Sequence, residues 1–404
     1  MKNKFGSTIF ACFIGYVVQA IVNGFVPLLF VTFQSSYGIP IEKITLLITI
    51  NFIIQLFTDL AASVIVDKLG YRICVVAAHL FSMTGLILLT VLPEAFSDPF
   101  IGLLIAVFFY AIGGGMIEVV ISPIVEACPS EHKDKTMSLL HSFYCWGSVA
   151  VIVVSALFFN VIGIEHWKIL ALVWAIVPLA NAILFCFVPL KNVIEEGEKG
   201  LSIPQLLRSG RFWIFFIVIM CAGASESAIA QWASVFVEEG LGLSKTIGDL
   251  VGPAVFAVAM GISRVLYGKF GDKLRLESVM AFSGALCVLA YLITALVPVA
   301  AISLVGMGIC GFSVGIMWPG TYSAASRSIK GGGNAMFALL ALGGDLGCTG
   351  GPTLVGFIAD AFGGDINVGI LFATLFPLIL MIVMFSYIAH LKRKPLPIQE
   401  ERLD

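Results

Sequence analysis

Charged side chains are scarce in this sequence. They account for only 12% of its 404 residues, whereas hydrophobic side chains account for 59%. A soluble protein of this length carries about a quarter charged residues, because its surface must be solvated. The scarcity therefore excludes a soluble multidomain enzyme and a disordered scaffold, and the net charge of −2 gives no sign of a nucleic-acid partner. We expect a protein whose main solvent is lipid.

Motifs for nucleotide and metal chemistry are missing as well. The sequence has no Gly-x4-Gly-Lys-Ser/Thr loop, so we do not expect ATP to drive it. Its nine cysteines stand singly and its five histidines form no zinc-type spacing, so we expect no metal and no cofactor. An intramembrane enzyme would need a paired nucleophile and base. The adjacent His141 and Ser142 point about 100° apart on a helix, so we expect no enzyme.

The apolar residues form stretches long enough to cross a bilayer. A spanning helix needs about 20 apolar residues, and breaks in the pattern predict about twelve of them. The first stretch contains Gln19 and Asn23 and is too long for a cleaved signal, so we expect it to be retained. The expected helices cover residues 8–33, 43–66, 73–92, 99–127, 135–160, 167–189, 212–237, 245–270, 278–296, 301–327, 333–362 and 367–391.

Basic residues indicate the orientation of these helices. Most of the 23 Lys and Arg residues fall on the side that carries both termini, so we expect that side to be cytoplasmic. The one long charged connection lies at the middle of the chain. We therefore expect an N-terminal six-helix bundle at 1–190, a cytoplasmic linker at 191–211, and a C-terminal six-helix bundle with a cytoplasmic tail at 212–404. The expected location is the bacterial cytoplasmic (inner) membrane.

Two short patterns recur in the two halves. His141 and Asp345 hold nearly equivalent positions, and one charged pattern appears twice, as Asp59-x3-Ser63-x3-Asp67-Lys68 and as Arg264-x3-Gly268-x3-Asp272-Lys273. Parallel halves of six helices each are typical of major facilitator transporters. The repeats therefore favour an all-α membrane protein with twelve transmembrane helices in two six-helix bundles.

Three segments resemble known families. Asp67-Lys68-Leu69-Gly70-Tyr71-Arg72 resembles the major facilitator signature, with Ser63 in place of its usual first glycine. Glu118-x3-Ser122-Pro123 is similar to the Glu-x3-Asn-Pro segment of the fucose, galactose and glucose proton symporter family, with Ser122 in place of Asn. Gly223-x2-Glu226-x5-Trp232 is similar to a second pattern of that family, with one extra residue. The resemblance implies proton-coupled uptake of a hexose or deoxyhexose by alternating access.

Acids inside the expected spans need a reason, because a charge at the bilayer centre costs from about 2.5 to more than 10 kcal/mol. At about 1.5 Å per residue, Glu118 lies close to the midplane, and Glu226 and Asp345 lie at similar depth. We predict that these three acids couple transport to protons. Alternatives stay open: a structural hydrogen bond for Glu118, a sugar contact or a paired cation for Glu226, and a structural contact between domains for Asp345.

Charged residues nearer the cytoplasmic face are predicted to form a gate. Opposite charges at equivalent places in the two halves could bridge the halves when the carrier faces outward, and switching would break those pairs. The alternative is a static salt-bridge network. The predicted gate residues are Asp59, Asp67, Arg72, Arg264 and Asp272.

Polar residues at helical spacing predict a path for a sugar. Asn51, Gln55 and Asp59 share one helical face, as do Gln19 and Asn23. Amides can both donate to and accept from hydroxyls, and aromatic rings can pack on a sugar ring, although packing within the protein is the alternative for each aromatic residue. The predicted substrate-binding residues are Gln19, Asn23, Asn51, Gln55, Ser122, His141, Tyr144, Trp232, Trp318 and Tyr322.

The predicted partners are therefore a sugar, membrane lipid and a proton, with sodium as the alternative coupling ion, and we expect a monomer. Efflux of drugs or metabolites by the same fold is the competing function. It fits the apolar helix walls but explains the amide-rich faces less well. A sensor that binds sugar without transporting it is a further alternative.

Overall fold

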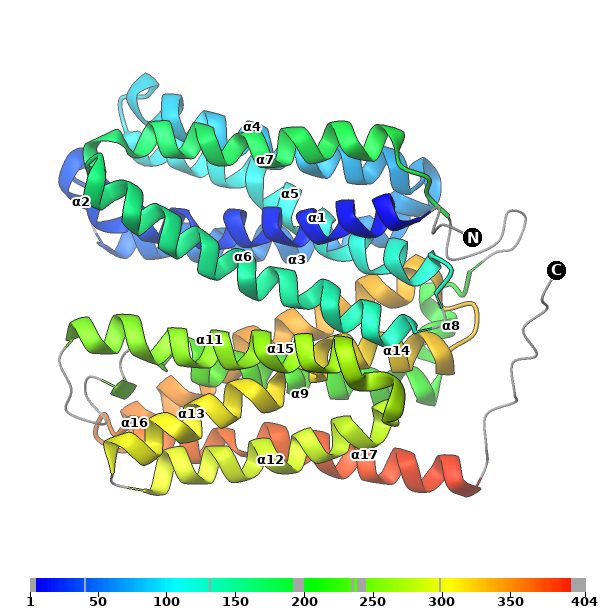
Figure 1. The fold of residues 1–404 in the computed structure, drawn as a ribbon. Helices are drawn as coiled ribbons and strands as arrows, with labels where there is room; N and C mark the ends of the chain where they lie inside the picture. The colour runs from blue at the N-terminus through cyan, green and yellow to red at the C-terminus, as the bar shows by residue number, and fades with distance from the viewer. Residues whose placement is uncertain are drawn as a thin grey trace. The chain divides into compact units, whose positions relative to one another are not determined.

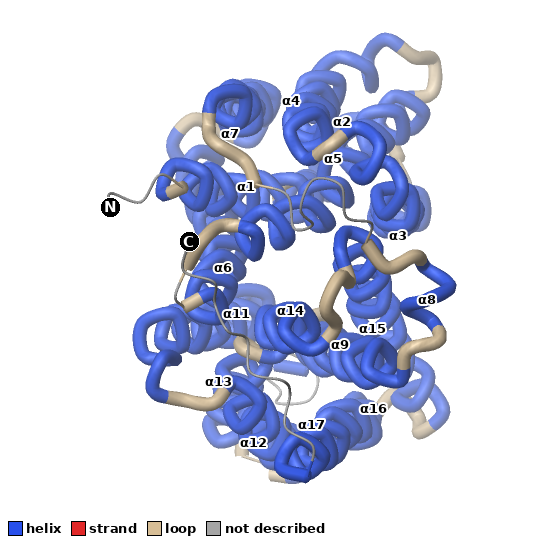
Figure 2. The backbone as a smooth tube through the Cα atoms, turned by 90° about the vertical axis from the view of Figure 1, so that its right-hand side faces the viewer, coloured by secondary structure: helices blue, strands red, loops and turns tan. Residues whose placement is uncertain are grey.

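The computed structural model describes residues 5–39, 41–130, 132–191, 200–233, 236–237, 245–297 and 299–393. This described part is almost entirely helical and contains no strand (Figures 1 and 2). The expected all-α class is therefore confirmed. The chain forms two compact units: unit 1 comprises Met1–Leu206 and Gly331–Asp345, and unit 2 comprises Leu207–Lys330 and Leu346–Asp404.

Unit 1 is built on long helices that follow the expected spans. Its elements are α1 (Gly6–Gly24), η1 (Val26–Leu29), α2 (Phe30–Tyr37), α3 (Ile41–Leu69), α4 (Tyr71–Ala95), α5 (Pro99–Ala127), α6 (Lys133–Val161), η2 (Ile164–His166) and α7 (Trp167–Phe187), followed by the short α8 (Ile203–Leu207). It also holds the first part of α15 (Gly333–Ala361), up to Asp345. The repeated patterns of the sequence did not predict that residues 331–345 would belong to unit 1.

Unit 2 is likewise helical. Its elements are α9 (Gly210–Ala230), α11 (Lys245–Phe270), η4 (Gly271–Lys273), α12 (Leu276–Leu296), α13 (Ala300–Val314), α14 (Met317–Ser328), the rest of α15, α16 (Ile366–Ala373) and α17 (Leu375–Arg393). Expected spans are interrupted between α1 and η1, α13 and α14, and α16 and α17, and the span expected at 212–237 has a turn at Gln231 and Trp232. The first three breaks each lie about one turn ahead of a proline, Pro27, Pro319 or Pro377, because a proline has no N–H for the carbonyl four residues earlier.

Nine helical segments of the described residues are long and apolar enough to cross a membrane. The other long helices, α3, α11 and α15, are 29, 26 and 29 residues long but are not among the nine. Each of the three contains charged residues, for example Asp59 in α3 and Asp345 in α15. The number of twelve crossings therefore stays an expectation.

Glycines allow helices of unit 2 to approach closely. A Cβ atom at Gly347 in α15 would lie 1.9 Å from the backbone oxygen of Met220 in α9, whereas nothing lies within 4 Å of a Cβ at Gly350 on the same helix. We expect Gly347→Ala to lower the free energy of unfolding by at least about 1–3 kcal/mol, since overpacking forces the backbone apart. Gly350→Ala is the control and should have almost no effect. The free energy of unfolding of both variants is measured in mixed micelles with increasing SDS. Equal values for the two variants would contradict the close approach of α9 and α15.

Candidate transport site

A carboxylate and an amide form the centre of the polar cluster in unit 1. The side-chain nitrogen of Gln19 in α1 donates to the carboxylate of Glu118 in α5 at 2.6 Å. A hydrogen bond to a charged acceptor is roughly twice as strong as one between neutral groups. Gln19 is buried, and its side-chain oxygen has no hydrogen-bond partner. This oxygen is therefore an open acceptor next to the acid.

Three further amides continue the cluster along α1 and α3. The Gln55 side chain donates to the side-chain oxygen of Asn23 at 2.9 Å, and the Asn51 side chain donates to the same oxygen at 3.5 Å. The predicted shared face of α3 is thus seen in the structure. Glycines of α5 bring these helices together, since a Cβ at Gly115 would lie 3.1 Å from the Gln55 Cα. The Asn51 oxygen is buried without a partner, which makes it a second open acceptor.

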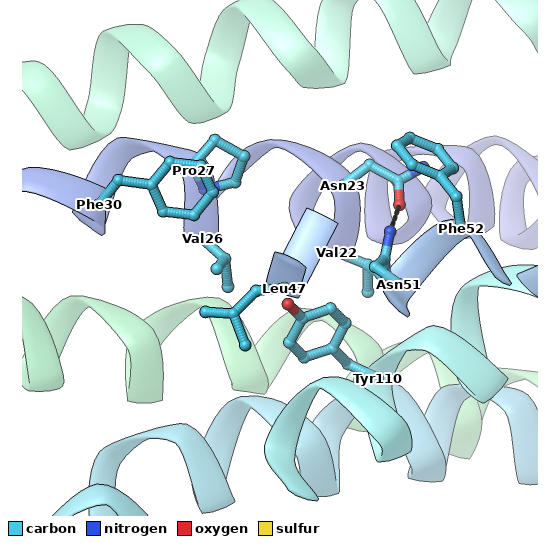
Figure 3. Close-up of a pocket in the computed structure, with 9 residues that line it drawn as sticks. All are labelled: Val22, Asn23, Val26, Pro27, Phe30, Leu47, Asn51, Phe52 and Tyr110. Carbon is cyan, nitrogen blue, oxygen red and sulfur yellow. Dashed lines mark hydrogen bonds between the residues drawn. The ribbon is translucent and has the colours of Figure 1, made fainter. Parts of the chain in front are cut away.

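A small pocket opens beside these amides. Figure 3 shows Asn23 and Asn51 facing each other across their hydrogen bond, with Tyr110, Phe52 and Pro27 among the lining residues. Its cavity volume is about 30 Å³. A single water needs roughly 10–15 Å³ on this scale, so the pocket has room for water but not for a sugar ring. A substrate in unit 1 would have to occupy space outside this pocket.

A second polar group of unit 1 joins α1, α5 and α6. The Tyr16 hydroxyl lies 3.0 Å from the Ser122 hydroxyl and 3.3 Å from the His141 Nε2, and Ser122 lies 3.4 Å from the same nitrogen. All three residues are buried. Ser122 and His141 were predicted from the sequence, whereas Tyr16 was not. The spacing of three residues from Tyr16 to Gln19 and of seven from Tyr16 to Asn23 on one helix was the available signal.

Two predicted acids meet elsewhere in unit 1. Asp59 in α3 has no exposed surface, and its carboxyl is within hydrogen-bonding reach of the carboxyl of Asp345. Asp345 is the last residue of unit 1. Glu118 is the next acid whose charge acts on Asp59. The structure thus joins a predicted gate residue to a predicted coupling residue.

Arg264 is a buried cation of unit 2 and bonds in two directions. Arg264 in α11 forms an ion pair with Glu226 in α9 at 3.3 Å, and its Nε donates to the backbone oxygen of Gly315 at 2.9 Å. Pro319 cannot donate to that oxygen, because it lies four residues after Gly315 and has no N–H. The guanidinium therefore satisfies the carbonyl that the proline leaves open. Arg264 is 3% exposed and Glu226 20%.

The predicted aromatic residues are held by packing in each unit. In unit 2, the rings of Trp318 and Tyr322 meet edge-on with centroids 6.4 Å apart, and both side chains are buried. Trp232 donates from its indole nitrogen to the backbone oxygen of Pro352 at 3.0 Å. Tyr144 in α6 is half-buried in unit 1. Contact of these four rings with a substrate stays a prediction.

Comparison with known proteins decides the family. The profile of the Major Facilitator Superfamily matches residues 9–337. The chain belongs to this superfamily. Members of the superfamily are membrane transporters rather than enzymes, so the expected all-α membrane fold, multi-pass membrane location and absence of enzyme activity are confirmed.

Solved structures of this superfamily share the fold. The Escherichia coli fucose:proton symporter aligns with a TM-score of 0.81 and 15% identity, over 95% of this chain and 99% of that chain. A proton:xylose symporter bound to 6-bromo-6-deoxy-D-glucose aligns with a TM-score of 0.80 and 10% identity, over 96% of each chain. At such identities the likeness shows the fold alone.

A sequence relative covers only part of the chain. It is an uncharacterized superfamily transporter from Yersinia pestis, and it is 27% identical over 173 residues. The match covers 42% of this chain and 44% of the relative, so it spans less than half of either protein.

The superfamily signature, Asp67 to Arg72, runs from the end of α3 into α4 and makes contacts within unit 1. Arg72 donates to the backbone oxygens of Phe185, Cys186 and Val188 at 2.7, 2.8 and 2.9 Å. It therefore satisfies carbonyls at the end of α7 that have no partner within that helix. Asp67 accepts a hydrogen bond from the side chain of Asn334, which in turn accepts one from the Tyr71 hydroxyl.

The gate between the two halves stays a prediction. Arg264 pairs within unit 2, and Asp59, Asp67 and Arg72 have their partners within unit 1. The fifth predicted gate residue, Asp272, lies in η4, and its side chain is outside the described residues.

Proposed function

We propose that this transporter takes up a monosaccharide, a hexose or deoxyhexose, together with a proton by alternating access. The bacterial cytoplasmic membrane, with both termini in the cytoplasm, is the proposed location. The observation that carries the proposal is the position of Glu118 in a cluster of amides, where Gln19 donates to it at 2.6 Å. Such a site combines one titratable group with several neutral groups that can bind hydroxyls.

Two open acceptors favour a sugar over a lipophilic drug. The side-chain oxygens of Gln19 and Asn51 are buried without hydrogen-bond partners. An unpaired buried acceptor is costly unless a ligand or water supplies a donor. Sugar hydroxyls are such donors, whereas a lipophilic drug has few of them. The fucose and xylose symporters that share the fold are consistent with this choice.

Glu118 is the proposed coupling acid, with Glu226 and Asp345 as further members of the proton path. In unit 2 the charge of Glu226 is balanced by Arg264. Glu118 accepts a hydrogen bond from the neutral amide of Gln19. A half-buried acid among amides inside a membrane span is costly to keep ionised, so we assign to it the uptake and release of the coupled proton. Sodium in place of the proton is the alternative for the same acid.

Proton flow driven by sugar tests the proposal. In vesicles that contain the purified protein, we expect one or more sugars of a panel of hexoses and deoxyhexoses to cause proton uptake from the medium. Protein-free vesicles are the control for leakage. If no sugar moves protons while lipophilic cations are exported, the protein is an efflux transporter. If uptake requires sodium and leaves the external pH unchanged, sodium is the coupling ion.

A further inference from the structure

The two carboxyl groups that lie close together in unit 1 constrain each other's protonation state. Asp59 in α3 and Asp345 in α15 lie within hydrogen-bonding reach of each other. An ionised carboxylate is only an acceptor of hydrogen bonds, so two ionised carboxylates cannot bond to each other. One of the two must carry a proton for this contact to form.

Within the part of the chain that the structure describes, no other group supplies a donor or a balancing charge to Asp59. Both of its carboxyl oxygens are buried, and no amide, hydroxyl or basic group of the described residues donates to them. The charged groups that act on Asp59 are Asp345 from α15 and Glu118 from α5, and both are acids. Among the described residues, no Lys, Arg or His acts on Asp345 either. Without a proton, the pair would be two unbalanced negative charges beside a third acid.

We propose that Asp59 and Asp345 bind one proton between them, and that this shared proton holds residues 331–345 against α3. The site is separate from the hydrogen bond between Gln19 and Glu118. With the proton bound, an O–H of one carboxyl donates to the ionised oxygen of the other, and the pair has a net charge of −1. Release of the proton to water breaks that hydrogen bond and leaves a net charge of −2, which repels the two helices.

The rest of the segment is held by two hydrogen bonds near its start and by the packing of small side chains. Asn334 donates to Asp67 and accepts from the Tyr71 hydroxyl. Ala338 and Ala341 of α15 belong to the same hydrophobic cluster as residues of α3. Alanine side chains bury little apolar area, so their contribution is small compared with that of larger residues. Loss of the carboxyl contact is therefore expected to loosen the segment, most of all near its end. Because Asp345 is also a member of the proposed proton path, the inference extends the proposed function, but the proton site itself is a property of the folded protein without sugar.

Infrared spectroscopy and hydrogen exchange on the sugar-free protein in lipid nanodiscs test the site. A pH titration should show the C=O band of one protonated carboxylic acid, which Asp59→Asn and Asp345→Asn should each remove. Below the pH at which this band disappears, opening of residues 331–345 in the wild type should increase by up to about tenfold per pH unit, because opening releases the shared proton; above that pH opening should level off. The exchange rate of each wild-type peptide is divided by the rate of the same peptide in Asp59→Asn. This ratio removes the intrinsic effect of pH on exchange.

Matched variants separate this site from the coupling acid. Asp360→Asn changes an exposed acid of the same helix and should behave as the wild type does. Glu118→Gln should retain the carboxyl band of the pair, so failure of the sugar proposal and failure of this one are distinguishable. The proposal is overturned if the band persists in both Asp59→Asn and Asp345→Asn, or if sodium rather than acid protects residues 331–345.

Discussion

Glu118→Gln is expected to abolish accumulation of sugar against a gradient while preserving sugar exchange. With one proton carried per sugar, a pH difference of one unit across a vesicle membrane can concentrate the sugar about tenfold. The variant should reach only equal concentrations on both sides. The new amide has the shape of the acid and can still accept a hydrogen bond from Gln19, but it cannot take up a proton. Uptake and counterflow of radiolabelled sugar measure the two activities.

A second acid on α5 is the control for this prediction. Glu126 is buried, and its Oε1 lies 3.8 Å from the Lys133 Nζ. Glu126→Gln should therefore leave accumulation near the wild-type value. If Glu118→Gln still accumulates sugar, Glu118 is not the coupling acid. If exchange disappears together with accumulation, the acid is needed for binding or folding instead.

Local patterns explain which parts of the fold could be predicted. Apolar stretches of about 20 residues defined the positions of helices, and the four-residue spacing of Asn51 and Gln55 predicted that they share a face, which the structure shows in contact with Asn23. The breaks before Pro27, Pro319 and Pro377 were not predicted, although the missing N–H of proline was a readable signal. Other prolines, such as Pro123 in α5, lie inside unbroken helices, so proline alone does not decide where a helix breaks.

Pairings between distant helices could not be predicted in the same way. Helical periodicity shows which residues share a face, but it does not show which helix that face contacts. Asp59 and Asp345 are far apart in the sequence, and their contact depends on residues 331–345 belonging to unit 1. The partners of Arg264 likewise come from two separate helical segments, at Glu226 and Gly315. The position of these charged residues inside the expected spans indicated that they need partners, but it did not indicate which residues those partners are.

Arg264→Met is expected to be the most destabilising substitution in unit 2. It leaves the Glu226 carboxylate and the Gly315 carbonyl without the donors that Arg264 provides at 3.3 and 2.9 Å. Removing one partner of a buried ion pair typically costs about 3–5 kcal/mol, because the other charge stays buried without compensation. The free energy of unfolding in mixed micelles with increasing SDS should fall by that amount. Arg264→Lys should recover only part of the loss, since one ammonium group cannot replace a guanidinium that bonds in two directions.

An exposed pair of the same chemistry provides the control. Arg327 donates to Glu277 at 3.1 Å, with 40% of the arginine side chain exposed. Arg327→Met should therefore cost at most about 1 kcal/mol. The double variant Arg264→Met/Glu226→Met removes the unpaired charge as well, so it should be more stable than Arg264→Met alone. If the double variant is no more stable than the single one, the loss arises from the open Gly315 carbonyl before Pro319 rather than from the buried carboxylate. If Arg264→Met costs no more than Arg327→Met, the buried pair does not stabilise unit 2.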